Sequence, residues 1–279
     1  MAKKPSSARK RQPATAARKP AVAAKRKSHA APKKKSAPAP LKKAPVALHA
    51  ARFPGESRQY RAARNRLLEA EMALRRQVES VAALRRRLPL GGMVPQDYVF
   101  EEGAADLADT TTVRSVKMSE LFVRPDAALV VYSFMYGPHM AKACPSCTSI
   151  IDALEGTVVH AAQRINLVIV ASSPIARIRE FARERGWNRL RLLSSFGNSY
   201  NRDYHAQTAT GSQIPALNVF VRRGGNVHHT FGAELLYVTP EPGQNGRQCD
   251  MIWPLWNLFD YTPEGRGTDW HPKLAYAPA

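Results

Sequence analysis

The sequence contains few cysteines and no long apolar run. Three cysteines among 279 residues cannot form the dense disulfide framework of a small secreted domain, so we expect a reducing compartment. The chain has no run of about 18 apolar residues, which argues against a membrane span. Its basic N-terminus also lacks the apolar core of a secretory signal. We therefore expect a cytoplasmic protein with no membrane partner.

Acidic residues are missing from residues 1–52, which contain 16 lysines and arginines. The rest of the chain contains 26 basic and 22 acidic residues, so its charge is nearly balanced. The basic segment consists mainly of Ala, Lys, Arg, Pro and Ser, and it cannot bury enough apolar surface to offset the entropy of ordering. We expect a disordered tail that binds DNA or RNA phosphates non-specifically through counterion release. The alternatives are a tail that only solubilises the protein and a transit peptide, although dense prolines argue against the latter.

Glycine and proline are absent between residues 56 and 88, where strong helix formers dominate. We therefore expect residues 53–92 to form a helical arm. An apolar residue recurs every seven positions along it, at Tyr60, Leu67, Leu74, Val81 and Leu88. This row forms one side of an amphipathic helix. The arm either packs on its own protein or joins a second copy in a homodimer, since a heptad row is typical of a coiled-coil seam.

Residues 93–279 show the alternation of strands and helices that is typical of an α/β domain. The continuous apolar runs 128–134 and 165–171 predict strands that are covered on both faces. Helical patterns follow at 147–163 and from Pro174 to Gly186. The other expected elements are strands at 98–100, 111–116 and 190–193, a hairpin of 216–222 with 227–231, and an aromatic helix at 250–260. The predicted fold is therefore a central mixed sheet flanked by helices.

The motif Cys144-Pro145-Ser146-Cys147 carries the main chemical signal of the sequence. Pro145 suits the first turn of a helix, which would place Cys144 at the helix N-terminus. Free amide groups and the helix dipole favour a thiolate at that position. A thiolate attacks disulfides, and Cys147, one turn further on, could then resolve the mixed disulfide. We therefore predict that Cys144 and Cys147 are the catalytic pair.

Half of a zinc site is the alternative interpretation of this motif. Zinc would need two more ligands, for which Cys249, His139 and His205 are available. The chain has no second pair of cysteines at this spacing, whereas structural zinc sites normally show paired ligand spacing. We therefore expect no metal and no bound organic cofactor.

A second element, Ile214-Pro215, stands directly before the predicted hairpin. Together with the cysteine motif after a buried strand, it makes the chain resemble the thioredoxin superfamily. The resemblance implies that Pro215 is cis and lies against the cysteines. It also implies that Ile214 offers backbone groups to an extended substrate. Without the resemblance, Pro215 would be an ordinary strand-edge proline.

The resemblance extends to one thioredoxin-like family, known only as domain of unknown function 899. It covers about Gly55 to Tyr276. It rests on the strings ESRQYRAAR (56–64), VPQDYVF (94–100), YSFMYGP (132–138), CPSCTS (144–149), LRLLSSFGNSYNRDYH (190–205), IPALNVF (214–220) and PLWNLFDYTPEGRGTDW (254–270). Membership implies the fold but no activity, because the function of the family is not established.

Three further residues are candidates for substrate binding. Tyr136 and His139 precede the cysteines, where they could flank the site, and Arg202 could stabilise a thiolate or an anion. For His139 the alternative is an ordinary surface position, and for Arg202 it is an ion pair with Asp203 inside the loop.

The function that we expect is cytosolic thiol–disulfide exchange on a protein or small-molecule disulfide. One alternative is a binding or scaffold protein whose tail associates with nucleic acid. The other is a peroxiredoxin-like peroxide reductase that uses Cys144. The threonine that peroxiredoxins carry three residues before the reactive cysteine is Ala141 here, which counts against that alternative.

Overall fold

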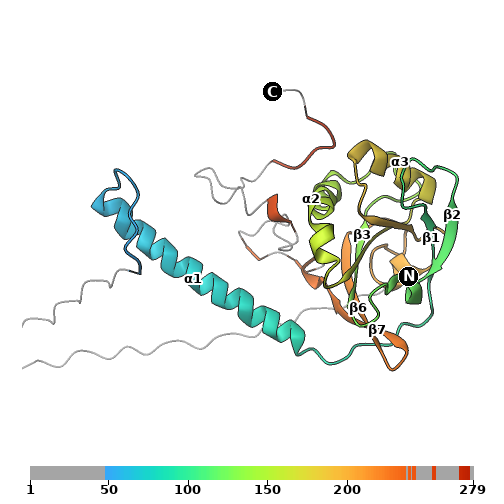
Figure 1. Cartoon of the computed structure of the whole chain (residues 1–279), viewed down its shortest axis with the longest axis horizontal. Helices are drawn as coiled ribbons and strands as arrows, with labels where there is room; N and C mark the ends of the chain where they lie inside the picture. Colours follow the sequence, from blue (N-terminus) through green and yellow to red (C-terminus); the bar gives the residue numbers. More distant parts are fainter. Residues whose placement is uncertain (1–47, 237, 240, 243–252, 256–269, 277–279) are drawn as a thin grey trace, which may run out of the picture. The chain divides into compact units, whose positions relative to one another are not determined.

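The computed structural model of the chain describes residues 48–236, 238–239, 241–242, 253–255 and 270–276 (Figure 1). Most of the predicted basic tail and Cys249 lie outside the described residues. The aromatic helix predicted at 250–260 also lies outside them, apart from residues 253–255. The chain divides into two compact units, residues 1–66 and 67–279.

Helix α1 (Arg58–Arg86) confirms the helix predicted between residues 56 and 88. Its first turn is capped by Ser57, whose hydroxyl accepts a hydrogen bond from the Tyr60 amide at 3.0 Å. Four residues of the heptad row are exposed, namely Tyr60, Leu67, Leu74 and Leu88. The two predictions for this apolar row, packing on its own protein or joining a second copy, therefore remain predictions.

The unit of residues 67–279 is built on a seven-stranded sheet in the order β2-β1-β5-β4-β3-β6-β7, within the part of the chain that the structure describes. Its strands are β1 (Val99–Gly103), β2 (Val113–Lys117), β3 (Leu129–Phe134), β4 (Asn166–Ala171), β5 (Arg191–Ser194), β6 (Ala216–Arg223) and β7 (Asn226–Gly232). Strands β3, β4 and β5 are parallel, whereas the other neighbours pair antiparallel. The sheet is therefore mixed, as predicted.

Helices connect the parallel strands in sequence order (Figure 1). They are α2 (Pro145–Ala161) between β3 and β4 and α3 (Ile175–Arg185) between β4 and β5, whereas the short α4 (Tyr200–Asp203) lies between β5 and the antiparallel β6. Single 3-10 turns lie at η1 (Met118–Leu121) and η2 (Glu234–Leu236). This alternation confirms the α/β class.

The two faces of the sheet form separate hydrophobic clusters. Because side chains alternate along a strand, Tyr132 and Phe134 of β3 join the cluster that contains residues of α2 and α3. Leu129 and Val131 belong to the opposite cluster, with Tyr98. All four β3 side chains are almost fully buried. The prediction that residues 128–134 form a strand covered on both faces is thus confirmed.

The predicted hairpin is also present. Strands β6 and β7 pair through Arg223 and Asn226, and the two residues between them are glycines. Gly224 and Gly225 have φ values of +56° and +83°, which residues other than glycine rarely adopt. The local sequence therefore determines this turn.

No helix among the described residues combines the length and the apolar character that a membrane crossing requires.

Candidate functional site

Cys144 lies at the N-cap of α2, at the end of the loop that follows β3. Its sulfur accepts a hydrogen bond from the Cys147 amide at 3.5 Å, and Pro145 occupies the first helical position. The Cys144 amide donates to the Met135 carbonyl at 3.1 Å, which ties the two ends of the loop together. The sequence-based placement of Cys144 at a helix N-terminus is therefore confirmed.

The two thiols differ in burial and in proton affinity. Cys144 is partly exposed, Cys147 is only 2% exposed, and both are free thiols. A hydrogen bond from the Cys147 thiol and, against the effect of burial, the Cys147 and Ser146 amides lower the pKa of Cys144 to about 6. The same bond, burial and the charge of Cys144 raise the pKa of Cys147 well above its ordinary value. Near neutral pH the pair therefore holds one thiolate and one thiol.

Arg177, in the first turn of α3, holds the loop that leads to Cys144. Its guanidinium donates to the carbonyls of Pro138 at 2.9 Å and Met140 at 2.8 Å. It also lies over the Tyr136 ring, 4.7 Å from the centroid. Sequence reasoning missed Arg177, because a side chain that bonds to carbonyls about forty residues earlier leaves no local pattern.

Ile214 and Pro215 lie at the end of the sheet from which the cysteine loop leaves β3. The register pairs Ala216 with Ser133, so Pro215 lies beside the end of β3, where that loop begins. No described peptide bond is cis, so the expectation of a cis Pro215 is wrong. The Ile214 amide already donates to the Ala206 carbonyl at 2.9 Å. The Ile214 amide, one of the backbone groups predicted to receive a substrate, is therefore already used within the protein.

Tyr136 and His139 occupy different environments in the cysteine loop. Tyr136 is buried in the cluster that contains Cys147, where its ring packs against Phe134 and Phe181. His139 is exposed at the surface. Tyr136 is thus a core residue that supports the cysteine loop. His139 lies at the surface, which is the alternative that we considered for it.

Arg202 is exposed and lines two cavities of about 610 Å³ each. One of them includes Ile214, and the other includes Pro138 of the cysteine loop. Asp203, the alternative partner of Arg202, accepts hydrogen bonds from the Tyr98 hydroxyl and the Ser199 hydroxyl, both at 2.6 Å. Arg202 therefore borders hollows that extend toward both predicted parts of the site.

The zinc alternative can be compared with the described residues alone. Among them, no group of three or more His, Cys, Asp or Glu side chains could hold a metal ion. Cys249, one of the three further ligands considered for that alternative, lies outside this part of the chain.

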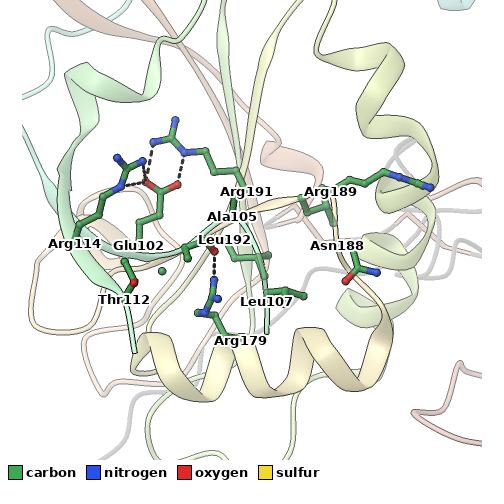
Figure 2. A pocket seen from close by; sticks show the side chains of 13 residues that line it. Glu102, Ala105, Leu107, Thr112, Arg114, Arg179, Asn188, Arg189, Arg191 and Leu192 are labelled. Carbon is green, nitrogen blue, oxygen red and sulfur yellow. Dashed lines mark hydrogen bonds and ion pairs between the residues drawn. The ribbon is translucent and has the colours of Figure 1, made fainter. Parts of the chain in front are cut away.

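A separate cavity of about 540 Å³ is rich in arginine (Figure 2). Glu102 of β1 lies between Arg191 of β5 and Arg114 of β2, and it accepts hydrogen bonds from them at 2.6 Å and 2.9 Å. Burial raises the pKa of Glu102, but these two arginines outweigh burial and hold it below its ordinary value. Arg179 donates to the Asp106 and Asp109 carbonyls, both at 2.7 Å. These contacts tie three strands and a loop together, and the cysteines do not line this cavity.

A parallel β3-α2-β4 unit, an antiparallel hairpin beside β3, and two cysteines at the start of α2 together define a thioredoxin-like fold. Residues 51–277 match the family of bacterial proteins of unknown function known as DUF899. The chain therefore belongs to this family.

No curated protein matches the chain. Among solved structures, it is similar to the reduced 2-Cys peroxiredoxin of Plasmodium vivax, with 14% identity and a TM-score of 0.39 over 61% of this chain and 97% of that one. It is also similar to Mycobacterium tuberculosis AhpC, with 15% identity and a TM-score of 0.39 over 60% of this chain and 90% of that one. A mutant of Xanthomonas campestris peroxiredoxin Q shares 8% identity, with a TM-score of 0.39 over 51% of this chain and 84% of that one.

Proposed function

We propose that the protein is a thiol–disulfide oxidoreductase in which Cys144 attacks and Cys147 resolves. The observation that carries the proposal is the pairing of a partly exposed Cys144, with its pKa lowered to about 6, and a buried Cys147 thiol one helical turn away. A thiolate that exists at neutral pH and can reach solvent is the species that disulfide exchange requires.

The first step uses the Cys144 thiolate as the nucleophile. Its sulfur attacks one sulfur of a substrate disulfide, an S–S bond forms between Cys144 and the substrate, and the other substrate sulfur leaves as a thiolate. The backbone amides of Cys147 and Ser146 stabilise the Cys144 thiolate before it attacks.

The second step uses Cys147. After losing its proton, its sulfur attacks the Cys144 sulfur, the bond to the substrate breaks, and a Cys144–Cys147 disulfide forms. The two substrate sulfurs are thus released as thiols, and the protein is oxidised by two electrons. These steps use only the two protein sulfurs and the substrate disulfide, and a thiol reductant must then reduce the Cys144–Cys147 disulfide before the protein can react again.

Peroxide reduction by the same two sulfurs is the second candidate, because a partly exposed Cys144 thiolate also fits it. The thiolate would attack one peroxide oxygen to give a sulfenic acid and release water or an alcohol. Cys147 would then condense with the sulfenic acid, which forms the same disulfide and releases water. Both candidates produce the same oxidised protein and differ only in the oxidant.

A comparison of two oxidants on the full-length reduced protein tests both candidates. We expect a protein or aromatic disulfide to oxidise the cysteine pair much faster than hydrogen peroxide does, and Cys144→Ser to abolish the reaction. Faster oxidation by peroxide would favour the second candidate. A pair that neither oxidant converts to a disulfide would refute both.

A further inference from the structure

The arginine-rich cavity of Figure 2 is lined by more positive than negative charge. Its volume of about 540 Å³ is in the range of small-molecule sites. Glu102 is the only carboxylate among the described residues that line it, whereas four arginines do so, namely Arg114, Arg179, Arg189 and Arg191. Four positive charges and one negative charge give the lining a formal charge of +3. Such an excess around a cavity favours the binding of an anion.

The cavity lies where strands β1 and β5 separate. The two strands pair as far as Glu102 and Leu193. Gly103 and Leu192, the next residues of the two strands, line the cavity instead of pairing. A ligand in this cavity would therefore lie between two strand ends, and side chains from β1, β2, β5 and α3 line the space around it.

Glu102 orients two of the arginines without using all of their donors. Its carboxylate accepts hydrogen bonds from Nε and Nη2 of Arg191 at 2.6 and 3.0 Å, and from Nη2 and Nε of Arg114 at 2.9 and 3.2 Å (Figure 2). Within the described part of the chain, the Nη1 group of either arginine has no hydrogen-bond partner. Each guanidinium is therefore held in place by Glu102 and keeps donors for a second anion, as its planar fork allows.

Arg179 is a buried cation whose partners are all neutral. The residue is 6% exposed, and its guanidinium donates to the main-chain carbonyls of Ala104, Asp106 and Asp109. Among the described residues, no carboxylate forms an ion pair with it. Carbonyl dipoles stabilise the cation but leave its net charge in place, and a buried charge is costly unless it is paired. An anion bound in the cavity would supply the pairing charge.

The backbone of β1 makes room for this arginine. Gly103 has no Cβ, and a Cβ added there would lie 2.5 Å from both Cδ and Nε of Arg179. These distances are well below van der Waals contact, so a larger residue at position 103 would displace the guanidinium. The glycine thus contributes to the placement of Arg179 beside the cavity.

We propose that this cavity is a binding site for a small phosphorylated molecule. Arg179 and the Arg114–Arg191 pair supply the charge that recognises the phosphate group, and Leu107 and Leu192, which also line the cavity, contact the organic part. A phosphate monoester has a charge close to −2 at neutral pH, which matches the excess of the lining better than the single charge of a carboxylate does. The inference is independent of the proposed thiol exchange, because neither cysteine lines the cavity.

The test titrates the full-length protein with three probes in isothermal titration calorimetry, at a constant ionic strength of about 0.15 M. Phenyl phosphate should bind saturably. Inorganic phosphate should bind roughly tenfold more weakly, because it lacks an apolar part that contacts the leucines. Benzoate should also bind roughly tenfold more weakly, because it has one negative charge rather than two.

Arg114→Gln is the diagnostic variant, because the Arg114 side chain is 65% exposed and its replacement should preserve the fold. We expect its affinity for phenyl phosphate to be roughly fivefold lower. Arg164→Gln is the matched control, since it removes the same charge from an exposed arginine outside the cavity, and its affinity should be unchanged. Every variant carries the same basic N-terminal segment, so a difference between them arises in the cavity. If Arg114→Gln does not fold, Arg114→Lys keeps a positive charge beside Glu102 but loses the planar fork, and it should also lower the affinity.

Three results would overturn the inference. The first is an affinity for phenyl phosphate that is unchanged in the Arg114 variant, or lowered equally by Arg164→Gln, because binding would then follow the total charge of the protein. The second is benzoate binding as tight as that of phenyl phosphate, which would contradict recognition of a phosphate group. The third is the absence of saturable binding for every probe.

Discussion

Removal of the Cys147 thiol should raise the pKa of Cys144, because that thiol is the largest single cause of the lowered value. Cys147→Ala deletes the S–H donor and leaves the Cys147 and Ser146 amides in place. The Cys144 thiolate then keeps its backbone hydrogen bonds but loses its side-chain partner.

The size of the effect follows from the strength of a charged hydrogen bond. Such bonds contribute about 1.5–3 kcal/mol, which corresponds to a pKa change of roughly one to two. Because Cys144 is partly exposed, solvent replaces part of the lost bond, and we expect the lower end of this range. An increase from about 6 by roughly one reduces the thiolate fraction at pH 6 about fivefold.

Alkylation of Cys144 by iodoacetamide, followed against pH in a Cys249→Ser background, measures this change. The parent rate should have its midpoint near pH 6. The Cys147→Ala rate should be roughly twofold lower at pH 6, since the fivefold smaller thiolate fraction is partly offset by a more reactive thiolate. It should also reach a plateau roughly 2.5-fold higher at alkaline pH, because a more basic thiolate is a better nucleophile. The two profiles should therefore cross.

Ser146→Ala is the control for this experiment, since Ser146 acts on Cys144 through its backbone amide, which the substitution keeps. Its profile should match that of the parent. A parent midpoint near 8.5, the value of an ordinary cysteine, would refute the reasoning at its first step. Parent and Cys147→Ala profiles with the same midpoint would show that the thiol pair is not hydrogen-bonded.

Three further predictions concern stability and the tail. Glu102→Gln should lower the free energy of unfolding by roughly 3 kcal/mol at pH 7, because it leaves two arginines without their carboxylate. Because the pKa of Glu102 is lowered in the folded protein, this difference in stability should be complete above the ordinary pKa of 4.5 and should disappear as the pH falls through the folded pKa. A difference between the urea midpoints of parent and variant that does not change down to pH 3 would contradict this prediction. Gly91→Ala should destabilise the protein by roughly 1–3 kcal/mol in thermal unfolding, since an added Cβ would overlap the His229 carbonyl oxygen, whereas Gly92→Ala, with open space around it, should not. Replacing the lysines and arginines of residues 1–47 by glutamine in the full chain should weaken retention on DNA and flatten its salt dependence, and equal retention would remove the nucleic-acid prediction.

The elements that the sequence predicted well are those specified by local chemistry. Continuous apolar runs marked the parallel strands, because a strand covered on both faces has no polar positions. Two glycines marked the hairpin turn, where φ is positive. A proline after the first cysteine placed Cys144 at the start of α2. Each of these signals lies within a few residues of the feature that it predicts.

The parts that the sequence did not reveal depend on contacts between distant segments. Arg177 holds carbonyls of the cysteine loop, and carbonyls have no side-chain identity that a sequence could display. The largest cause of the low pKa of Cys144 is the Cys147 thiol, which the helix-terminus reasoning did not include. The Ile214–Pro215 peptide bond is trans although the resemblance implied cis, because tertiary context rather than the dipeptide selects the isomer.

The hydrogen bond from the Ile214 amide to Ala206 has a consequence for selectivity. An incoming polypeptide cannot align there as an added strand through paired main-chain bonds, since the donor half of such a pair is already used inside the protein. Under the proposed function, we therefore expect recognition to depend on shape and on side chains such as Arg202. A compact disulfide without any peptide backbone would lose nothing by the absence of this donor.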